Sequence, residues 1–353
     1  MTGTGGPPRR PGPADLPGPV RPPGAASGQA PVTTHAEPVM GTVFSFTAVR
    51  GELSPAAVRA ALAAACRVLH RCDAVFSTWD AASPASRFRR GEAALAQLPP
   101  EFGEVLRECH AARAASGGWF DPWAMPGGFD PTGLVKGWAV ERALDALRAA
   151  GLPGALVNGG GDMAAFGSPA DGPRWRAGIR HPWRAGALAC VIEIGHGPVA
   201  EERGLEPAGG SGPWGPGARP RGKGVPPRAS IGHGPVAEER GLEPSGGSGP
   251  WGPGARPRGK GVPPRASIAA VATSGPYERG AHLIDPATGR PASRAASATV
   301  TGPSLALADA LATGVAVGGD EALEVVAGLD GYAGYLIRPD GSETDTGGIA
   351  FAR

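Results

Sequence analysis

An aspartate and a threonine stand four residues apart in the apolar segment LALADALATG, as Asp309 and Thr313. Positions i and i+4 share one face of a helix. A carboxylate and a hydroxyl that converge there suit Mg²⁺, a hard cation that takes oxygen ligands. The alternative is a solvated aspartate beside a threonine bonded back to its own helix. Spacing alone leaves both open, although the surrounding Ala and Leu argue against simple surface charge.

The segment FDPTGLVKG combines a turn with two charged side chains. Asp130 and Lys136 lie on either side of Thr132-Gly133, where we expect the turn, and a helix is expected from Trp138 to Ala150. A chain that enters a helix presents backbone N–H groups, which bind phosphate. A plain turn with a surface lysine would explain the same residues.

Two further side chains, His282 and Trp79, have two interpretations each. His282 opens the segment HLIDPATG, and its imidazole can take a proton near neutral pH, but one histidine before an apolar pair is more often structural. Trp79 in FSTWD can stack on a planar ring or pack in the core, and Met40 in PVMGT is by itself a core residue. The other histidines, His35 and His70 among them, receive no role.

Two apparent motifs are set aside. The 4 cysteines form no CxxC pattern, so no zinc site is expected, and those in helical patterns, such as Cys66, are expected to be buried free thiols. The run Gly217–Lys223 fits G-x-x-x-x-G-K but is followed by glycine and prolines rather than a hydroxyl and a helix. A phosphate-binding loop is therefore not expected there.

Glycine and proline are concentrated in two parts of this 353-residue chain. Residues 1–34 cannot bury enough apolar surface to offset their ordering entropy, so we expect a disordered tail and a folded domain over 35–353. Residues 194–267 are two copies of a 37-residue unit that differ only where Ala208 becomes Ser245. They lack apolar periodicity, and we interpret them as a low-complexity insertion in a surface loop.

The remaining pattern mixes helices and strands without regular strand–helix–strand spacing, which favours an α+β fold. Helices are expected over 54–70, 101–115, 138–150 and 304–317, and strands over 42–49, 154–157, 188–193, 268–272, 298–301 and 332–338. With 34 basic and 32 acidic residues, bulk charge does not favour nucleic acid or a membrane surface. No signal peptide or membrane segment is recognised, so a cytoplasmic protein is expected, exported only if the true start lies upstream.

Six segments together resemble the ApbE family, the FAD:protein FMN transferases. They are EPVMGT (37–42), FSTWD (76–80), GWFDP (118–122) with FDPTGLVKGWAVERA (129–143), VNGGGDM (157–163), ATSGPYERGAHLIDPATGRP (272–291) and SATVTGPSLALADALATG (297–314). The resemblance runs from about Thr34 to the C-terminus and implies a single ApbE-like, T-fold-like domain, interrupted by the insertion.

The resemblance also implies roles for individual residues. It implies that Asp309, Thr313 and the backbone carbonyl of Gly133 are metal ligands. It implies that His282 and Asp309 are the catalytic residues. The implied flavin- and nucleotide-contacting positions are Met40, Trp79, Trp119, Phe120, Asp121, Asp130, Lys136 and Ile284. The chain departs from the family pattern at Trp119, which is larger than usual, and at Pro276, where an acidic or amide residue is usual.

The implied activity is Mg²⁺-dependent transfer of FMN from FAD to a threonine or serine of an acceptor protein through a phosphoester bond, with release of AMP. Such an enzyme is a phosphotransferase whose substrates are FAD and a protein. The alternatives are a Mg²⁺-dependent FAD pyrophosphatase, with water in place of the acceptor hydroxyl, and a flavin-binding or flavin-delivery protein without turnover.

Overall fold

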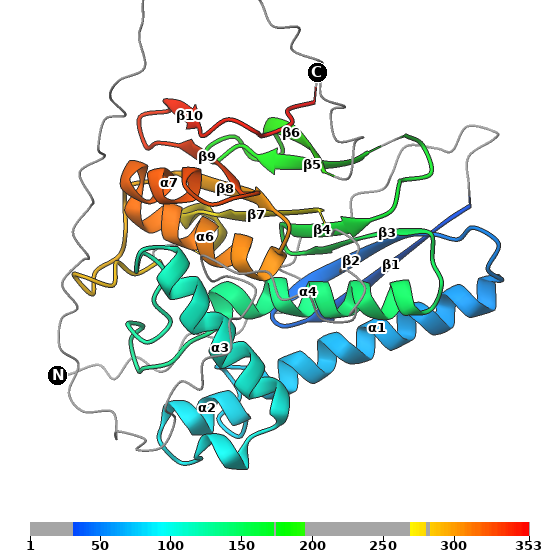
Figure 1. Ribbon diagram of the computed structural model, residues 1–353, viewed down its shortest axis with the longest axis horizontal. Helices are drawn as coiled ribbons and strands as arrows, with labels where there is room; N and C mark the ends of the chain where they lie inside the picture. Colours follow the sequence, from blue (N-terminus) through cyan, green and yellow to red (C-terminus); the bar gives the residue numbers. More distant parts are fainter. Residues whose placement is uncertain (1–30, 173, 195–268, 280–282, 353) are drawn as a thin grey trace, which may run out of the picture.

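The computed structural model describes residues 31–172, 174–194, 269–279 and 283–352 (Figure 1). Eight antiparallel strands form one sheet in the order β1-β2-β3-β4-β7-β8-β9-β10. They are β1 (Val32–Val39), β2 (Thr42–Val49), β3 (Gly154–Gly159), β4 (Asp162–Phe166), β7 (Ala269–Ser274), β8 (Ser297–Gly302), β9 (Ala333–Ile337) and β10 (Glu343–Asp345). The expected α+β class is confirmed.

The helices cover one face of this sheet, and a separate hairpin covers the other (Figure 1). The helices are α1 (Pro55–Phe76), α2 (Pro84–Arg89), α3 (Pro100–Ala115), α4 (Thr132–Ala149), α5 (Pro276–Arg279), α6 (Leu305–Gly318) and α7 (Asp320–Ala327), with a short 3₁₀ turn at Leu95–Gln97. The hairpin consists of β5 (Trp175–Arg180) and β6 (Leu188–Ile194). Within the described residues, no helix is long and apolar enough to cross a membrane.

Strand alternation decides which side chains face the helices. In β4, Ala164 joins the core under the helices, whereas Met163 and Ala165 pack against the hairpin. In β7, Ala270 and Ala272 face the helices. Because side chains alternate with a period of two, the polar residues two positions along, Asp162 of β4 and Ser274 of β7, point to the helix side as well.

Helix starts follow the capping signals only in part. The Ser54 hydroxyl accepts the Ala57 N–H at 3.2 Å and fixes the expected start of α1, although α1 runs to Phe76 rather than to residue 70. The expectation that α4 begins at Trp138 is wrong: it begins at Thr132. The Asp130 carboxylate accepts the Thr132 N–H at 3.0 Å, so the anticipated turn is the first turn of the helix.

Two boundaries of the Gly/Pro-rich segments also differ. Strand β1 begins at Val32, three residues inside the expected tail, because its whole length pairs with β2 from Val32↔Val49 to Val39↔Thr42. Ile194, the first residue of the expected insertion, ends β6. The rest of that insertion and residues 1–30 lie outside the described residues.

Candidate active site

A pocket lies between helices α4 and α6 and the ends of the strands beneath them. Nine residues of the expected site line it: Trp119, Phe120, Asp121, Asp130, Gly133, Lys136, Ile284, Asp309 and Thr313. Leu283, Ser274, Thr132, Pro122 and Met125 complete the lining. Residues separated by more than 190 positions in the sequence therefore meet at one place.

Asp309 and Thr313 occupy successive turns of α6, as their spacing predicts. The Asp309 side chain is 3 % exposed, and its Oδ2 accepts the backbone N–H of Gly137 at 3.3 Å. In a regular helix that N–H pairs with the carbonyl of Gly133. Asp309 therefore contacts α4 at the N–H that, within the helix, faces the Gly133 carbonyl.

Thr313 faces the first turn of α4 at close range. A β-carbon built at Gly133 would lie 3.2 Å from Thr313 Oγ1 and 3.1 Å from Phe120 Cε2, so glycine leaves a small cradle there. On the other side, Ser274 Oγ lies 3.3 Å from Thr313 Oγ1. A carboxylate, two hydroxyls and a carbonyl form an all-oxygen donor set, which is the kind that Mg²⁺ prefers. The residues present therefore fit the expected metal.

A close crossing of α4 and α6 holds these groups together. A β-carbon at Gly137 would lie 2.5 Å from the carbonyl oxygen of Leu305, so only glycine permits this approach. Glu141, 5 % exposed, reaches from α4 to the start of α6 and accepts the N–H groups of Leu305 at 2.5 Å and Ala306 at 3.2 Å. These two N–H groups have no partner within a helix. Glu141 thus fixes α6, and with it Asp309, relative to α4.

One cation in the pocket is held by a buried carboxylate. Lys136 of α4 forms an ion pair with Asp162 Oδ2, and the Asp162 side chain is 1 % exposed. Asp162 Oδ1 accepts the backbone N–H of Thr273 at 2.9 Å, which ties β4 to β7. Lys136 therefore presents its charge at the pocket from a fixed position.

The other two carboxylates of the lining are also anchored. Asp121 pairs with Arg113 (Nε to Oδ2, 2.8 Å) and accepts the Trp123 N–H at 3.0 Å. Asp130 caps α4 and lies 3.8 Å from Arg89 Nη1. Both side chains thus have structural partners in addition to their place at the pocket.

A match to a protein-family model identifies the family of the chain. The model of the ApbE family matches residues 40–127, 125–200 and 241–336, which is well over half of the chain. The chain belongs to the ApbE family. None of the curated protein sequences compared with it matches.

Solved structures of ApbE proteins have the same fold. The flavin transferase ApbE from Vibrio cholerae matches with a TM-score of 0.59 and 18 % identity, over 91 % of this chain and 98 % of that one. The apo flavinyl transferase ApbE from Pseudomonas stutzeri gives 0.59 and 18 %, over 93 % and 96 %. The apbe protein from Thermotoga maritima gives 0.61 and 17 %, over 89 % and 96 %.

Two of the expected site residues that the structure describes, Trp79 and Met40, are not part of the pocket lining of this ApbE-family chain. Trp79 is 54 % exposed, and His282 lies outside the described residues. Met40 forms the β1–β2 turn with Gly41, and its φ of 54° is in the left-handed region that non-glycine residues rarely adopt. Both positions of such a two-residue hairpin turn require positive φ. Roles for these residues stay predictions.

The structure adds three residues to the site: Asp162, Ser274 and Glu141. Each was visible in a quoted segment as a polar residue among apolar or glycine neighbours. The signal that could have found the first two is strand alternation, because both fall in the helix-facing register of their strands. Glu141 could have been suspected as a charge on the apolar face of a helix, since such a charge needs a buried partner.

Proposed function

We propose that this ApbE-family protein is a Mg²⁺-dependent FAD:protein FMN transferase. It joins FMN through a phosphoester bond to a threonine or serine of an acceptor protein and releases AMP. The observation that carries the proposal is the buried Asp309, held beside Thr313 and Gly133 in a pocket with an anchored lysine and two aromatic residues. This combination suits a dinucleotide: oxygen ligands and a cation for its diphosphate, and apolar surface for its rings.

Asp309, Thr313 and the Gly133 carbonyl would hold the metal, with Ser274 positioning Thr313 through their hydroxyl contact. When bound, Mg²⁺ neutralises negative charge on the diphosphate and on the oxygen that leaves. The remaining work falls to the chain's own residues, because phosphoryl transfer depends mainly on positioning and charge.

Lys136 and the N-terminus of α4 bind the diphosphate from the same side. Lys136 is kept in place by Asp162, and the first turn of an 18-residue helix favours anionic oxygens. Trp119 and Phe120, 6 % and 4 % exposed, and the neighbouring Leu283 and Ile284 give the apolar wall that holds the rings and excludes water.

In the transfer step, the acceptor hydroxyl oxygen attacks the phosphorus on the FMN side. A new oxygen–phosphorus bond forms, the bond to AMP breaks, and the hydroxyl proton passes to a general base. His282 stays our predicted base: it directly precedes Leu283, which lines the pocket, and an imidazole has a suitable pKa.

The test is an incubation of the full chain with FAD, Mg²⁺ and a tagged candidate acceptor, followed by mass spectrometry of the acceptor. The transferase adds one FMN to it and releases one AMP. A parallel reaction without acceptor, analysed by chromatography, distinguishes a pyrophosphatase, which releases FMN and AMP at full rate. A flavin-binding protein would do neither and would retain intact FAD.

Asp309→Ala is expected to lower transfer by at least about 100-fold, because the metal loses its charged side-chain ligand and with it several kcal/mol of charge stabilisation. The matched control is Asp145→Ala, which removes an aspartate of α4 that is paired with Arg148 and does not line the pocket. It should transfer normally. Unchanged turnover of Asp309→Ala at saturating FAD would contradict the proposal.

A further inference from the structure

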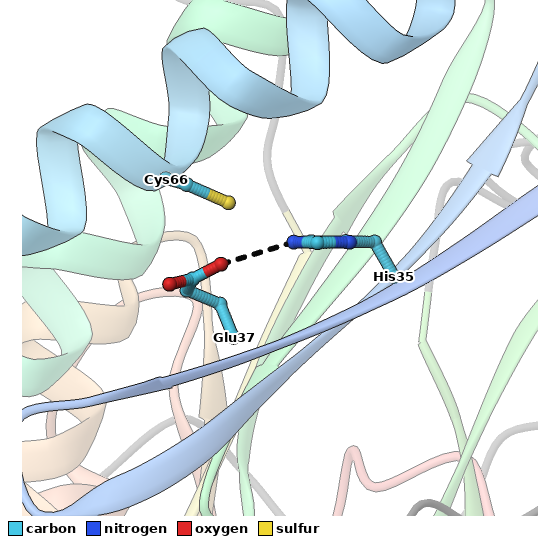
Figure 2. A group of neighbouring side chains, drawn as sticks. All are labelled: His35, Glu37 and Cys66. Atoms are coloured by element: carbon cyan, nitrogen blue, oxygen red, sulfur yellow. Dashed lines mark hydrogen bonds and ion pairs between the residues drawn. The ribbon is translucent and has the colours of Figure 1, made fainter.

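Two elements bring potential metal ligands to one place away from the pocket. His35 and Glu37 are two residues apart on β1 and so share one face of the strand. Cys66 and His70 are four residues apart on α1 and share one face of the helix. Strand β1 is at the edge of the sheet and α1 passes over it, with the Cys66 side chain directed toward the strand pair (Figure 2).

The ligand atoms already lie within a small volume. One nitrogen of His35, one oxygen of Glu37 and the sulfur of Cys66 are all within 4.8 Å of one another. His35 Nε2 lies 3.1 Å from Glu37 Oε2 (Figure 2). His70 Nε2 lies 2.7 Å from the other oxygen, Oε1. Glu37 is thus at the centre of the group.

We propose that His35, Glu37 and Cys66 bind a zinc-like transition-metal ion, with His70 as the residue that positions Glu37. A nitrogen, a carboxylate oxygen and a thiolate form a mixed donor set that suits Zn²⁺, whereas Mg²⁺ takes oxygen ligands. Three protein ligands leave a fourth position of the tetrahedron for water or for an external group.

Little movement is needed to close the site. Zinc bond lengths to N, O and S separate tetrahedral ligands by roughly 3.3–3.7 Å; His35 Nε2 and Glu37 Oε2 are 3.1 Å apart, and no two of the three ligand atoms are more than 4.8 Å apart. Binding replaces the His35–Glu37 hydrogen bond with two bonds to the metal, and the Cys66 thiol releases its proton to solvent as the metal–sulfur bond forms. The hydrogen bond from His70 to Glu37 is retained, as is usual for the partners of ligating carboxylates.

The arrangement has a structural consequence. It links the exposed edge strand to α1 through residues that are 33 positions apart. No zinc site was expected from the sequence, because the cysteines form no closely spaced pattern. Here two ligands, His35 and Glu37, are at strand spacing on β1, and the third, Cys66, is on α1 one helical turn from His70, so only the fold joins them.

The test uses the full chain without a histidine tag, stripped with chelator and kept reduced, in excess Mg²⁺ so that the pocket does not compete. Addition of Co²⁺ should give a thiolate-to-cobalt charge-transfer band that saturates at one equivalent, and Zn²⁺ should displace it. Cys66→Ser should abolish the band and weaken Zn²⁺ binding by about 100-fold or more. His70→Ala should weaken it by about 10- to 100-fold, as for other partners of a ligand.

Cys190→Ser and His181→Ala are the matched controls, since both residues lie at the β5–β6 hairpin and outside the cluster. Both should bind Co²⁺ and Zn²⁺ as the unaltered chain does. If Cys66→Ser does not fold, as judged by circular dichroism, His35→Ala at an exposed position takes its place and should lower Zn²⁺ affinity similarly. Absence of a thiolate band in the unaltered chain, or an equal band in Cys66→Ser, would overturn the proposal.

Discussion

At the scale of single residues, the pocket depends on charges that are buried with their partners. Asp162 is the most buried of these carboxylates, with 1 % of its side chain exposed, and it is bonded to Lys136 and to the Thr273 N–H. Removing one member of a buried ion pair leaves the other charge buried without a partner and lowers stability. Removing both members often changes stability little. The pair therefore offers a way to separate stability from ligand binding.

Lys136→Met is expected to lower the free energy of unfolding by about 3 kcal/mol, the lower end for buried pairs, because the Lys136 side chain retains 16 % exposure. The double variant Lys136→Met/Asp162→Asn should recover most of that stability. Both variants should bind FAD more weakly, since both lack the cation at the diphosphate. Urea unfolding and FAD fluorescence titration measure the two quantities.

The outcome that would contradict this assignment is specific. If the double variant recovered FAD binding together with stability, Lys136 would act only through the fold and would not contact the diphosphate. Arg142→Met provides the control for loss of a cation from α4, because Arg142 pairs with Glu104 away from the pocket.

At the scale of elements, the site is built by the crossing of α4 and α6. Gly133 and Gly137 lie one turn apart on α4, and both face α6 at distances that a side chain would disturb. The two contacts differ in kind. At Gly133 the neighbours are side chains, which can shift by a few tenths of an ångström, whereas at Gly137 the neighbour is the backbone of Leu305, which cannot shift without moving the helix.

Gly137→Ala is therefore expected to destabilise the protein by about 1–3 kcal/mol, the usual cost of overpacking a well-packed core. Gly103→Ala in α3 is the matched control: its β-carbon would meet only Arg107 Nη1, at 3.6 Å. Relief of glycine's entropy in a helix should make that variant about 0.5–1 kcal/mol more stable. Denaturant unfolding measures the stability of both variants. If both became more stable, or both less stable, the expectation would be contradicted.

A helix boundary can be predicted from the sequence where the residues that determine it are close together in the chain. The starts of α1 and α6 follow from Ser54 and Ser304, whose hydroxyls cap the helices, and the i, i+4 pair on α6 is confirmed. The first turn of α4 was missed because glycine and threonine favour a turn locally. Packing against α6 and the cap from Asp130 override that preference, and neither is visible in a window of sequence.

At the scale of the whole molecule, the sheet brings distant segments to one end. The β1–β2 and β3–β4 turns and the last residue of β7 lie there in the pairings Val39↔Thr42, Gly159↔Asp162 and Ser274↔Ala298. Nine residues of the pocket lining were expected through the family resemblance, whereas Asp162, Ser274 and Glu141 were not. Residue types and spacing alone do not predict that these groups meet, because this depends on strand order across segments more than 100 residues apart, and the β5 strand of the second layer was not recognised.

The Gly/Pro-rich repeat raises the last question at this scale, whether it contributes to transfer. It lies between β6, which ends at Ile194, and β7, which starts at Ala269, and these strands belong to different sheets. The family model leaves residues 201–240 unmatched between two matched segments. A role in catalysis is therefore not expected.

Replacing residues 195–268 with a 20-residue Gly/Ser linker should leave the rate of FMN transfer unchanged. Loop-closure entropy changes by only about 0.6 kcal/mol for each halving of length, so the shorter loop should raise the free energy of unfolding by about 1 kcal/mol. In a second variant the residues of both repeat copies are placed in random order. This variant keeps the length and composition of the segment and changes only its sequence. Suppose that the linker variant loses transfer tenfold without loss of stability and the scrambled variant does not. The length of this segment would then be needed for transfer to the acceptor protein. An equal loss in both variants would mean that the acceptor protein binds the sequence of the segment.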